Sequence, residues 1–176
     1  MSGVKWVEME IDSARDSHEP VLVEEILFWL QCKPGGVYVD CTLGYAGLAA
    51  RLLDRTAPDG ILVGIDRDAA ALAESQMRLR EVAHRVHFRH GNFCDLKALI
   101  MGSGVSQVDG VIFDLGVSSP QLDRAERGFS FRADGPLDMR MDSSRGETAA
   151  QWLSHADLQD IAGVLKEYGE ERFARR

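Results

Sequence analysis

Between residues 37 and 116 the chain alternates regularly between two kinds of segment. Short runs rich in β-branched and aromatic residues predict strands, and the stretches between them have the apolar spacing that predicts helices. The predicted strands span 37–41, 61–66, 86–91 and 109–116, and the predicted helices span 46–55, 68–80 and 95–101. Strands that are joined through helices pair in parallel, so this order predicts an α/β domain whose parallel sheet is covered on both faces.

The segments on either side have a different character. Residues 1–17 are polar and unpatterned, which predicts a leader, and residues 21–32 have the spacing of an amphipathic helix that ends at "KPGG". Residues 117–146 are dense in Gly, Pro, Ser, Asp and Arg and lack periodicity, and so long a loop is typical of a functional segment. Helical spacing then returns, with Ser154 as the predicted N-cap and Gly169 as the predicted stop.

Composition and charge narrow the classes of function. The chain has 176 residues, enough for one domain with a buried core, and its apolar runs are too short to span a membrane. Three cysteines without a C-x-x-C pair predict reduced thiols in a cytoplasmic protein. The net charge of −8 argues against nucleic-acid binding by bulk electrostatics. The last third nevertheless offers arginines for a local basic face, unless each is paired with a nearby acid: Arg124, Arg127, Arg132, Arg140, Arg145, Arg172, Arg175 and Arg176.

The first predicted strand runs into a glycine turn, "DCTLGYAG". In open α/β sheets, ligands bind beyond the carboxyl ends of the strands, often over this first turn. Gly44 and Gly47 would allow a left-handed backbone and a close approach to a ligand. Asp66 ends the next strand 19 residues after Gly47, the spacing at which a carboxylate binds a ribose diol. The turn therefore predicts a cofactor site, with helix capping by Asp40 and Asp66 as the alternative.

The carboxylate of Asp40 distinguishes between two cofactor classes. A dinucleotide would place its pyrophosphate at this turn, and a carboxylate in contact with it would cost about 1 to 4 kcal/mol. S-adenosylmethionine has no phosphate and carries a cationic sulfonium and an ammonium, which a carboxylate would favour. We therefore predict S-adenosylmethionine and disfavour a nucleotide-dependent oxidoreductase.

The fourth predicted strand leads into "FDLGVSSPQLD", a second segment whose residues could take part in catalysis. Asp114 ends that strand, and Ser118, Ser119 and Pro120 follow where a substrate should meet the cofactor. Hydrogen-bond acceptors at this place could orient an exocyclic amine whose lone pair is delocalised into its ring, and proximity would lower the remaining barrier. The alternative is an ordinary Ser-Pro turn that leaves a strand.

Several segments together resemble the MraW/RsmH family. They are "HEPVLVEEIL", "DCTLGYAG", "GIDRD", "FDLGVSSPQLDRAERGFSFRADGPLDMRMD" and "YGEERFARR", and they run from His18 to Arg176. The resemblance implies a Rossmann-like class I methyltransferase fold. It also implies methyl transfer from S-adenosylmethionine to the N4 of a cytosine in the decoding region of small-subunit ribosomal RNA. The expected partner is that RNA or the assembled small subunit.

The resemblance also implies roles for individual residues. Cofactor contacts are expected from Ala46, Gly47, Leu48, Asp66, Phe93, Asp114 and Gln121. Asp66 would accept the ribose hydroxyls, Phe93 would pack near the adenine, and Asp114 would face the methionine end. No metal and no nucleophilic cysteine is implied.

The chain departs from the family in the turn and in length. Where the family has Gly-Gly-His, this chain has Ala46-Gly47-Leu48, and Ala46 fits the turn if its φ angle is negative. By the resemblance, 18–122 is the first part of the cofactor domain and 123–176 is the active-site loop with the start of an inserted helical domain. The chain then stops inside that insertion, so an inactive cofactor- or RNA-binding fragment is the alternative function. An incomplete sheet would also expose an edge, which favours a homodimer.

Three further patterns are expected to be structural. His84, His87 and His90 are three residues apart, so on a strand they cannot share one face and one metal. Cys41 is expected to be a small buried apolar side chain. Met139 and Met141 in "LDMRMD" are expected to pack rather than bind.

Overall fold

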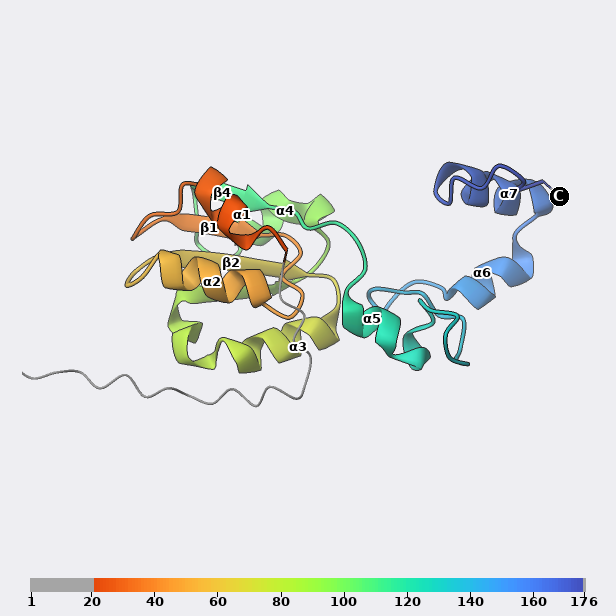
Figure 1. The fold of residues 1–176 in the computed structure, drawn as a ribbon, viewed down its shortest axis with the longest axis horizontal. Helices are drawn as coiled ribbons and strands as arrows, with labels where there is room; N and C mark the ends of the chain where they lie inside the picture. The colour runs from red at the N-terminus through yellow and green to blue at the C-terminus, as the bar shows by residue number, and fades with distance from the viewer. Residues whose placement is uncertain (1–20, 176) are drawn as a thin grey trace, which may run out of the picture.

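The computed structural model describes residues 21–175, and its centre is a four-stranded parallel sheet (Figure 1). The strands are β1 (Val37–Asp40), β2 (Ile61–Asp66), β3 (Val86–His90) and β4 (Gly110–Ile112), in the spatial order β3-β2-β1-β4. All three pairings are parallel. This order equals the first four strands of the doubly wound order 3-2-1-4-5-6, so the predicted Rossmann-like α/β fold with an incomplete sheet is confirmed.

Two apolar clusters show that both faces of the sheet are covered, as predicted. On one face Tyr38 and Leu62 pack with α1 (Val23–Trp29), α2 (Gly47–Arg55) and α3 (Ala69–Arg78). On the other face, Val39, Cys41, Val63 and Ile65 pack against η2 (Phe93–Asp95) and α4 (Leu96–Met101). Neighbouring residues of β1 and β2 thus alternate between the two cores, because successive side chains of a strand point to opposite faces.

The remaining elements follow the sheet or join its parts. A 3₁₀ turn, η1 (Arg80–Arg85), leads from α3 into β3. After β4 come α5 (Ser119–Asp123) and η3 (Ala125–Arg127), and then α6 (Ala149–His155) and α7 (Leu158–Glu167). Figure 1 shows that α6 and α7 lie apart from the sheet and its covering helices. Within residues 21–175, no helix combines the length and the apolar character needed to cross a bilayer.

Some predicted boundaries were wrong. The first helix is shorter than 21–32, because Leu22 and Gln31 on either side have φ angles of 58° and 50°. β4 ends at Ile112 rather than at residue 116, since the backbone N–H of Asp114 donates to Thr42 Oγ1 instead of extending the ladder. The predicted loop 117–146 contains α5 and η3.

The N-cap prediction near the end of the chain was also wrong. Ser154 lies inside α6, where its hydroxyl donates to the carbonyl of Gln151. Thr148 caps α6, and Asp157 caps α7 through hydrogen bonds from Gln159 and Asp160. A carboxylate accepts these two N–H groups better than a mid-helix hydroxyl could. The predicted leader 1–17 and His18 lie outside the described residues.

Candidate functional site

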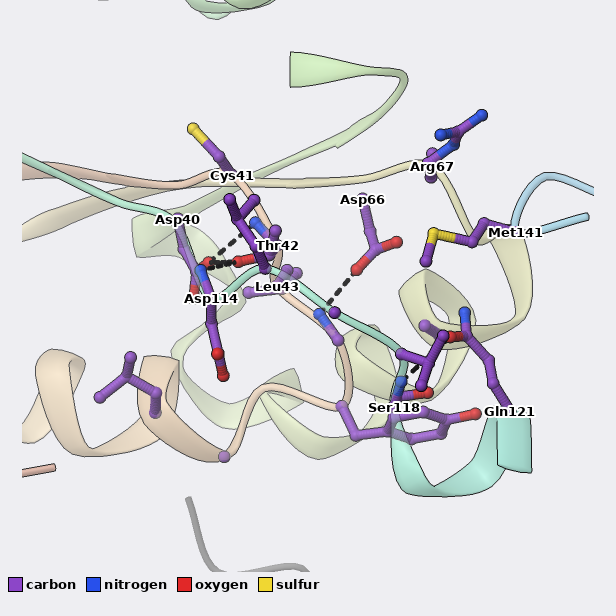
Figure 2. Close-up of a pocket in the computed structure, with 18 of the residues that line it drawn as sticks. Asp40, Cys41, Thr42, Leu43, Asp66, Arg67, Asp114, Ser118, Gln121 and Met141 are labelled. Atoms are coloured by element: carbon purple, nitrogen blue, oxygen red, sulfur yellow. Dashed lines mark hydrogen bonds between the residues drawn. The ribbon is translucent and has the colours of Figure 1, made fainter. Parts of the chain in front are cut away.

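A cavity of about 700 Å³ lies at the carboxyl ends of β1, β2 and β4. It is large enough for a cofactor-sized ligand. Its walls are the turn after β1, the ends of β2 and β3, and the segment from Asp114 to Gln121 after β4 (Figure 2). The site therefore occupies the crevice beside the point at which strand order reverses, between β1 and β4.

The glycine turn is held against β2 by its own backbone. The N–H of Leu43 donates to the carbonyl of Ile65 at 2.9 Å, and the N–H of Gly44 donates to Asp66 Oδ2 at 2.7 Å. Gly44 has a φ of 53° and Ala46 a φ of 59°, so both are left-handed. The condition placed on Ala46, a negative φ, is not met: an L-residue with a side chain occupies a conformation that glycine adopts without strain.

Three carboxylates surround this turn. Asp40 is buried, and its Oδ1 accepts the N–H of Thr42 at 3.0 Å. Asp66 uses its second oxygen to accept the N–H of Asp68 at 2.8 Å. Asp114 lines the cavity from the loop after β4. In Figure 2, Asp40 and Asp114 lie on one side of the turn and Asp66 on the other.

Burial dominates the electrostatics of this acidic group. Loss of solvent raises the pKa of Asp40 to about 7, with the charges of Asp66 and Asp114 acting in the same direction. Burial also raises the pKa of Asp66, against the lowering effect of its backbone hydrogen bonds. Two or three neighbouring carboxylates in a poorly hydrated crevice favour a cation and oppose a phosphate.

One aromatic ring of the cavity wall packs against a second ring just outside the wall. Phe93 lines the cavity from η2, and its ring meets that of Phe113 edge to face, with centroids 5.6 Å apart. Phe113 itself is half exposed in the loop after β4. Cys41, beside them on the core, is buried as predicted, and burial raises the pKa of its thiol to about 11.

Helix α5 forms the wall opposite the glycine turn. Ser118 precedes it, and the backbone N–H of Ser118 donates to Gln121 Oε1 at 3.0 Å (Figure 2). Pro120 occupies the first turn, where its missing N–H costs nothing. Gln121 is buried, and its Nε2 donates a hydrogen bond to Asp68 at 3.0 Å. Within the described residues, the buried Ser118 Oγ and Tyr45 hydroxyl have no hydrogen-bond partner. Both residues line the cavity, so these orphaned groups could serve a polar ligand.

The structure brings together most of the predicted site residues. Those that line the cavity are Asp40, Gly44, Gly47, Leu48, Asp66, Phe93, Asp114, Ser118, Pro120 and Gln121. Ala46 and Ser119 do not line it: Ala46 is buried in the core cluster, and Ser119 is the first residue of α5. The ligand contacts expected of all these residues stay predictions.

Sequence reasoning missed further lining residues, among them Tyr45, Arg67, Arg78 and Met141. Tyr45 directly follows Gly44, and Arg67 directly follows Asp66. Their position next to predicted site residues was therefore the sequence signal that could have identified them. No pattern marked Arg78 or Met141; Met141 lines the cavity, and the expectation that it packs rather than binds stays a prediction. Among the described residues, no three His, Cys, Asp or Glu side chains gather to hold a metal ion.

Comparison with known proteins decides the family. Residues 15–176 match the MraW methylase family. This chain belongs to that family. It is 50% identical over 159 residues to a ribosomal RNA small subunit methyltransferase H of Syntrophotalea carbinolica, covering 90% of this chain and 51% of the relative. It is 52% identical over 161 residues to the protein of that name in Thioalkalivibrio sulfidiphilus, covering 91% and 51%. The chain therefore spans about half the length of the curated relatives it matches.

Solved structures add a more distant likeness. An rRNA methylase crystal structure from Clostridium thermocellum aligns with a TM-score of 0.46 at 23% identity, covering 55% of this chain and 51% of that one. Fibrillarin of Aeropyrum pernix, solved with natively bound S-adenosyl-L-methionine, aligns with a TM-score of 0.41 at 16% identity, covering 46% and 34%.

Family membership confirms the predicted resemblance and makes Leu48 the point of interest in the turn. Leu48 is 8% exposed and belongs to the core cluster, although it also reaches the cavity wall. As the second residue of α2, it packs among Ala49, Leu52 and Leu53. An apolar side chain therefore suits this position structurally, and any ligand contact here would come mainly from the backbone.

The predicted basic face is smaller than the count of arginines suggests. Arg127 pairs with Asp68 at 2.7 Å, Arg140 with Asp138 at 2.7 Å, and Arg145 with Asp142 at 2.5 Å. Among the predicted arginines that the structure describes, no ion pair within the described residues is formed by Arg124, Arg132, Arg172 or Arg175. The alternative of locally paired arginines thus applies to three of them.

Proposed function

We propose that this chain is the cofactor-binding half of an S-adenosylmethionine-dependent methyltransferase that acts on the N4 of a cytidine in the decoding region of small-subunit ribosomal RNA. Membership of a methylase family and the names of the relatives support a methyltransferase. The observation that carries the proposal is the buried, acidic cavity at the turn of β1. A carboxylate group there suits a cationic ligand without phosphate.

Different residues along the cavity would bind different parts of the cofactor. Asp66 would accept the ribose hydroxyls with lone pairs that its two backbone donors leave free. Phe93 would pack on the base, and Asp40 and Asp114 would face the cationic end. S-adenosylmethionine would supply an electrophilic methyl group on its sulfonium.

The substrate end of the site lies at the segment before α5. The Ser118 hydroxyl, with no partner among the described residues, would accept a hydrogen bond from the target amine, and the carbonyls around Pro120 would hold its second N–H. Ser119, at the start of the same helix, would keep these carbonyls in place. Such positioning would aim the nitrogen lone pair at the methyl group. Arg124 and Arg132 would contact RNA phosphates, which are the most common protein contacts to nucleic acid.

Isothermal titration tests the cofactor assignment. We expect binding of S-adenosylmethionine and S-adenosylhomocysteine and none of NAD⁺. Asp66→Asn should weaken binding about ten- to hundredfold, because a hydrogen bond to a charged acceptor is worth about 1.5 to 3 kcal/mol. The exposed Asp59→Asn is the matched control and should bind as the wild type does. NAD⁺ binding in preference to S-adenosylmethionine would favour the oxidoreductase alternative.

The departure at Leu48 has its own test in the same titration. We expect the wild-type chain to bind S-adenosylmethionine through the backbone of this turn. If it does not bind and Leu48→His restores binding, the imidazole of the family is required and our interpretation of the turn is wrong.

A methyl-transfer assay tests the substrate. Tritiated S-adenosylmethionine would be offered with undermethylated small subunits or with naked RNA, to this chain and to a version extended to the length of its relatives. Transfer to N4 of cytidine by either version supports the proposal. Transfer by the longer version alone would show that these 176 residues are the inactive cofactor- or RNA-binding fragment considered as the alternative. Transfer by neither would refute the methyltransferase assignment.

A further inference from the structure

The side chain of Arg127 joins three segments that are far apart in the sequence. Its Nη1 donates to Asp68 Oδ2 at 2.7 Å, at the start of α3. Its Nη2 donates to the carbonyls of Arg140 and Met141, each at 3.1 Å. Its guanidinium also lies 5.9 Å from the ring centroid of Phe129. These contacts lie outside the cofactor pocket. Two of the joined segments, which contain Asp68 and Met141, nevertheless form part of the pocket wall.

Asp68 is the acidic partner of Arg127 in this connection between segments. Oδ1 caps α3 by accepting the N–H of Ala70 at 3.0 Å, and Oδ2 accepts from both Arg127 and Gln121. Burial opposes ionisation of Asp68, but the hydrogen bonds from Gln121 and Arg127 outweigh it and lower its pKa. The side chains of Asp68 and Arg127 are 5% and 13% exposed, so this is a buried and fully engaged ion pair. Removal of one partner of such a pair leaves the other without compensation.

The connection ends at two residues that line the cavity. Gln121 holds the start of α5 by accepting the N–H of Ser118, and it is itself held by Asp68. Met141 borders the cavity beside Gln121 and Arg67 (Figure 2), and its carbonyl is held by Arg127. Asp68, just after β2, therefore holds α5 through Gln121 and holds the segment around Met141 through Arg127.

We propose that Arg127 is a positioning residue for the cofactor pocket, which fixes the segment around Met141 to Asp68 after β2 and shares that carboxylate with Gln121 of α5. The planar guanidinium is suited to this task because it donates in two directions from a rigid fork, whereas a lysine ammonium cannot span the carboxylate and both carbonyls. The ligand involved is that of the proposed function, so the inference deepens that proposal. Arg127 acts through Asp68 and Met141 and is not placed in contact with the ligand.

The first test separates positioning from general stability. Arg127→Gln should raise the dissociation constant for S-adenosylhomocysteine about tenfold, the usual effect of removing a residue that orients a ligand-contacting one. Arg127→Lys should lie between this variant and the wild type. The matched control is Arg145→Gln, in the same segment, where a mostly exposed side chain pairs with Asp142 and does not line the cavity. We expect it to bind as the wild type does.

A double-mutant cycle tests the path. Asp68→Asn keeps a good N-cap for α3 and removes the charge that holds Arg127. Asp68→Asn also loses the acceptor of Gln121, so because Arg127 is anchored on Asp68, the variant with Asp68→Asn and Arg127→Gln should bind no more weakly than Asp68→Asn alone. Independent, multiplying losses would contradict a shared path.

Hydrogen exchange read by mass spectrometry needs no ligand. In Arg127→Gln the amides of residues 119–142 should lose protection, while those of β1 and β2 keep it. Unchanged protection of 119–142 together with unchanged affinity would overturn the inference. If the wild type binds neither S-adenosylmethionine nor S-adenosylhomocysteine, the proposed function fails, and the exchange experiment still decides whether Arg127 holds these segments.

Discussion

The side chain of Ala46 has two opposing effects on the stability of the fold. Its left-handed φ of 59° costs an alanine about 1 to 2 kcal/mol, which glycine would not incur. Its methyl group is fully buried, however, and a glycine would lose about 0.8 kcal/mol of burial and further chain entropy on folding. The stabilising and destabilising contributions nearly cancel, which explains how an alanine can occupy this left-handed position.

This balance predicts the effect of two substitutions. Ala46→Gly should leave the free energy of unfolding within about 1 kcal/mol of the wild type. Ala46→Val should lower it by about 2 kcal/mol or more, because a β-branched residue at positive φ is strained and the site is already filled. Urea unfolding measures both. A valine variant as stable as the wild type would mean that the turn does not hold this conformation in solution.

Asp40 gives the stability of the protein a specific pH dependence. Its pKa is raised from 3.8 in the unfolded chain to about 7 in the fold, so between these values the folded state binds the proton more tightly. Stability is therefore greatest at the acidic side and decreases as the pH rises towards 7, by about 3 to 5 kcal/mol for this group. Asp66, with a pKa shifted in the same direction, adds to the effect.

Asparagine at position 40 removes that titration. Asp40→Asn should lose clearly less unfolding free energy between pH 5 and pH 8 than the wild type does, with the contribution of Asp66 remaining in both proteins. Asp138 and Asp142 do not interfere, because hydrogen bonds from Arg140 and from Ser144 lower their pKa values to about 2, and their stabilisation is lost only in stronger acid. Denaturant titrations at the two pH values provide the comparison. Equal pH dependence in both proteins would show that Asp40 is ionised without cost.

At the scale of elements, the turn and β2 fit together because residue 64 lacks a side chain. A Cβ at Gly64 would lie 2.7 Å from Leu43 Cδ2 and 3.3 Å from its Cγ. Leu43 is buried, and its backbone donates to Ile65, so it cannot withdraw freely. The absence of a Cβ therefore sets how closely the glycine turn approaches the central strand.

Gly64→Ala should displace that turn. We expect a loss of about 1 to 3 kcal/mol of stability from overpacking, together with weaker binding of S-adenosylhomocysteine. Adding Leu43→Ala should recover part of the binding, since it removes the atoms that clash. Thermal unfolding and calorimetry of the single and double variants test this. A harmless Gly64→Ala would mean that Leu43 has space that the structure does not show.

The strands and their pairing could be predicted from the sequence more fully than the segment after them. β-branched runs such as "ILVGID" at 61–66 identify a strand, and the helices between them leave only parallel pairing. The end of β4 could not be predicted, because it depends on Thr42 Oγ1 accepting the N–H of Asp114, 72 residues away. Helix α5 had a local signal, a proline in the first turn after a serine, but the Ser-Pro pair also fits a turn.

The candidate site divides in the same way. The residues of the turn and of the strand ends could be predicted, because the topology of an α/β sheet brings the carboxyl ends of its strands together. The contact of Asp68 with Arg127, 59 residues apart, has no local signature in the sequence. It arises only when α5 and the segment after it fold back onto α3.

At the scale of the whole molecule, β4 forms one edge of the sheet. Among the strands of residues 21–175, β4 pairs only with β1, and Val111, Phe113, Leu115 and Val117 in and after it are 36–70% exposed. In the doubly wound order, a fifth strand would lie beside β4. An unpaired edge with apolar neighbours is a site of association.

We therefore expect this chain to self-associate as its concentration rises. Val111→Lys should reduce the association, because a charge on an edge strand disfavours pairing with a second copy. Phe131→Lys is the control, since Phe131 is fully exposed and lies outside β4. Light scattering coupled to size-exclusion chromatography measures the mass. A chain that stays monomeric at high concentration, or a lysine at 111 that changes nothing, would contradict an edge-mediated dimer.

The buried carboxylate of Asp40 also bears on how long the protein would persist in a cell. With the cavity empty, the fold holds an acid that would ionise more easily when unfolded. A cationic ligand offsets that cost, and a hundredfold excess over its dissociation constant stabilises the fold by about 2.7 kcal/mol. Proteases remove unfolded chains, so such a difference changes abundance severalfold. Under the proposed function, scarcity of the methyl donor would shorten the lifetime of the enzyme that consumes it.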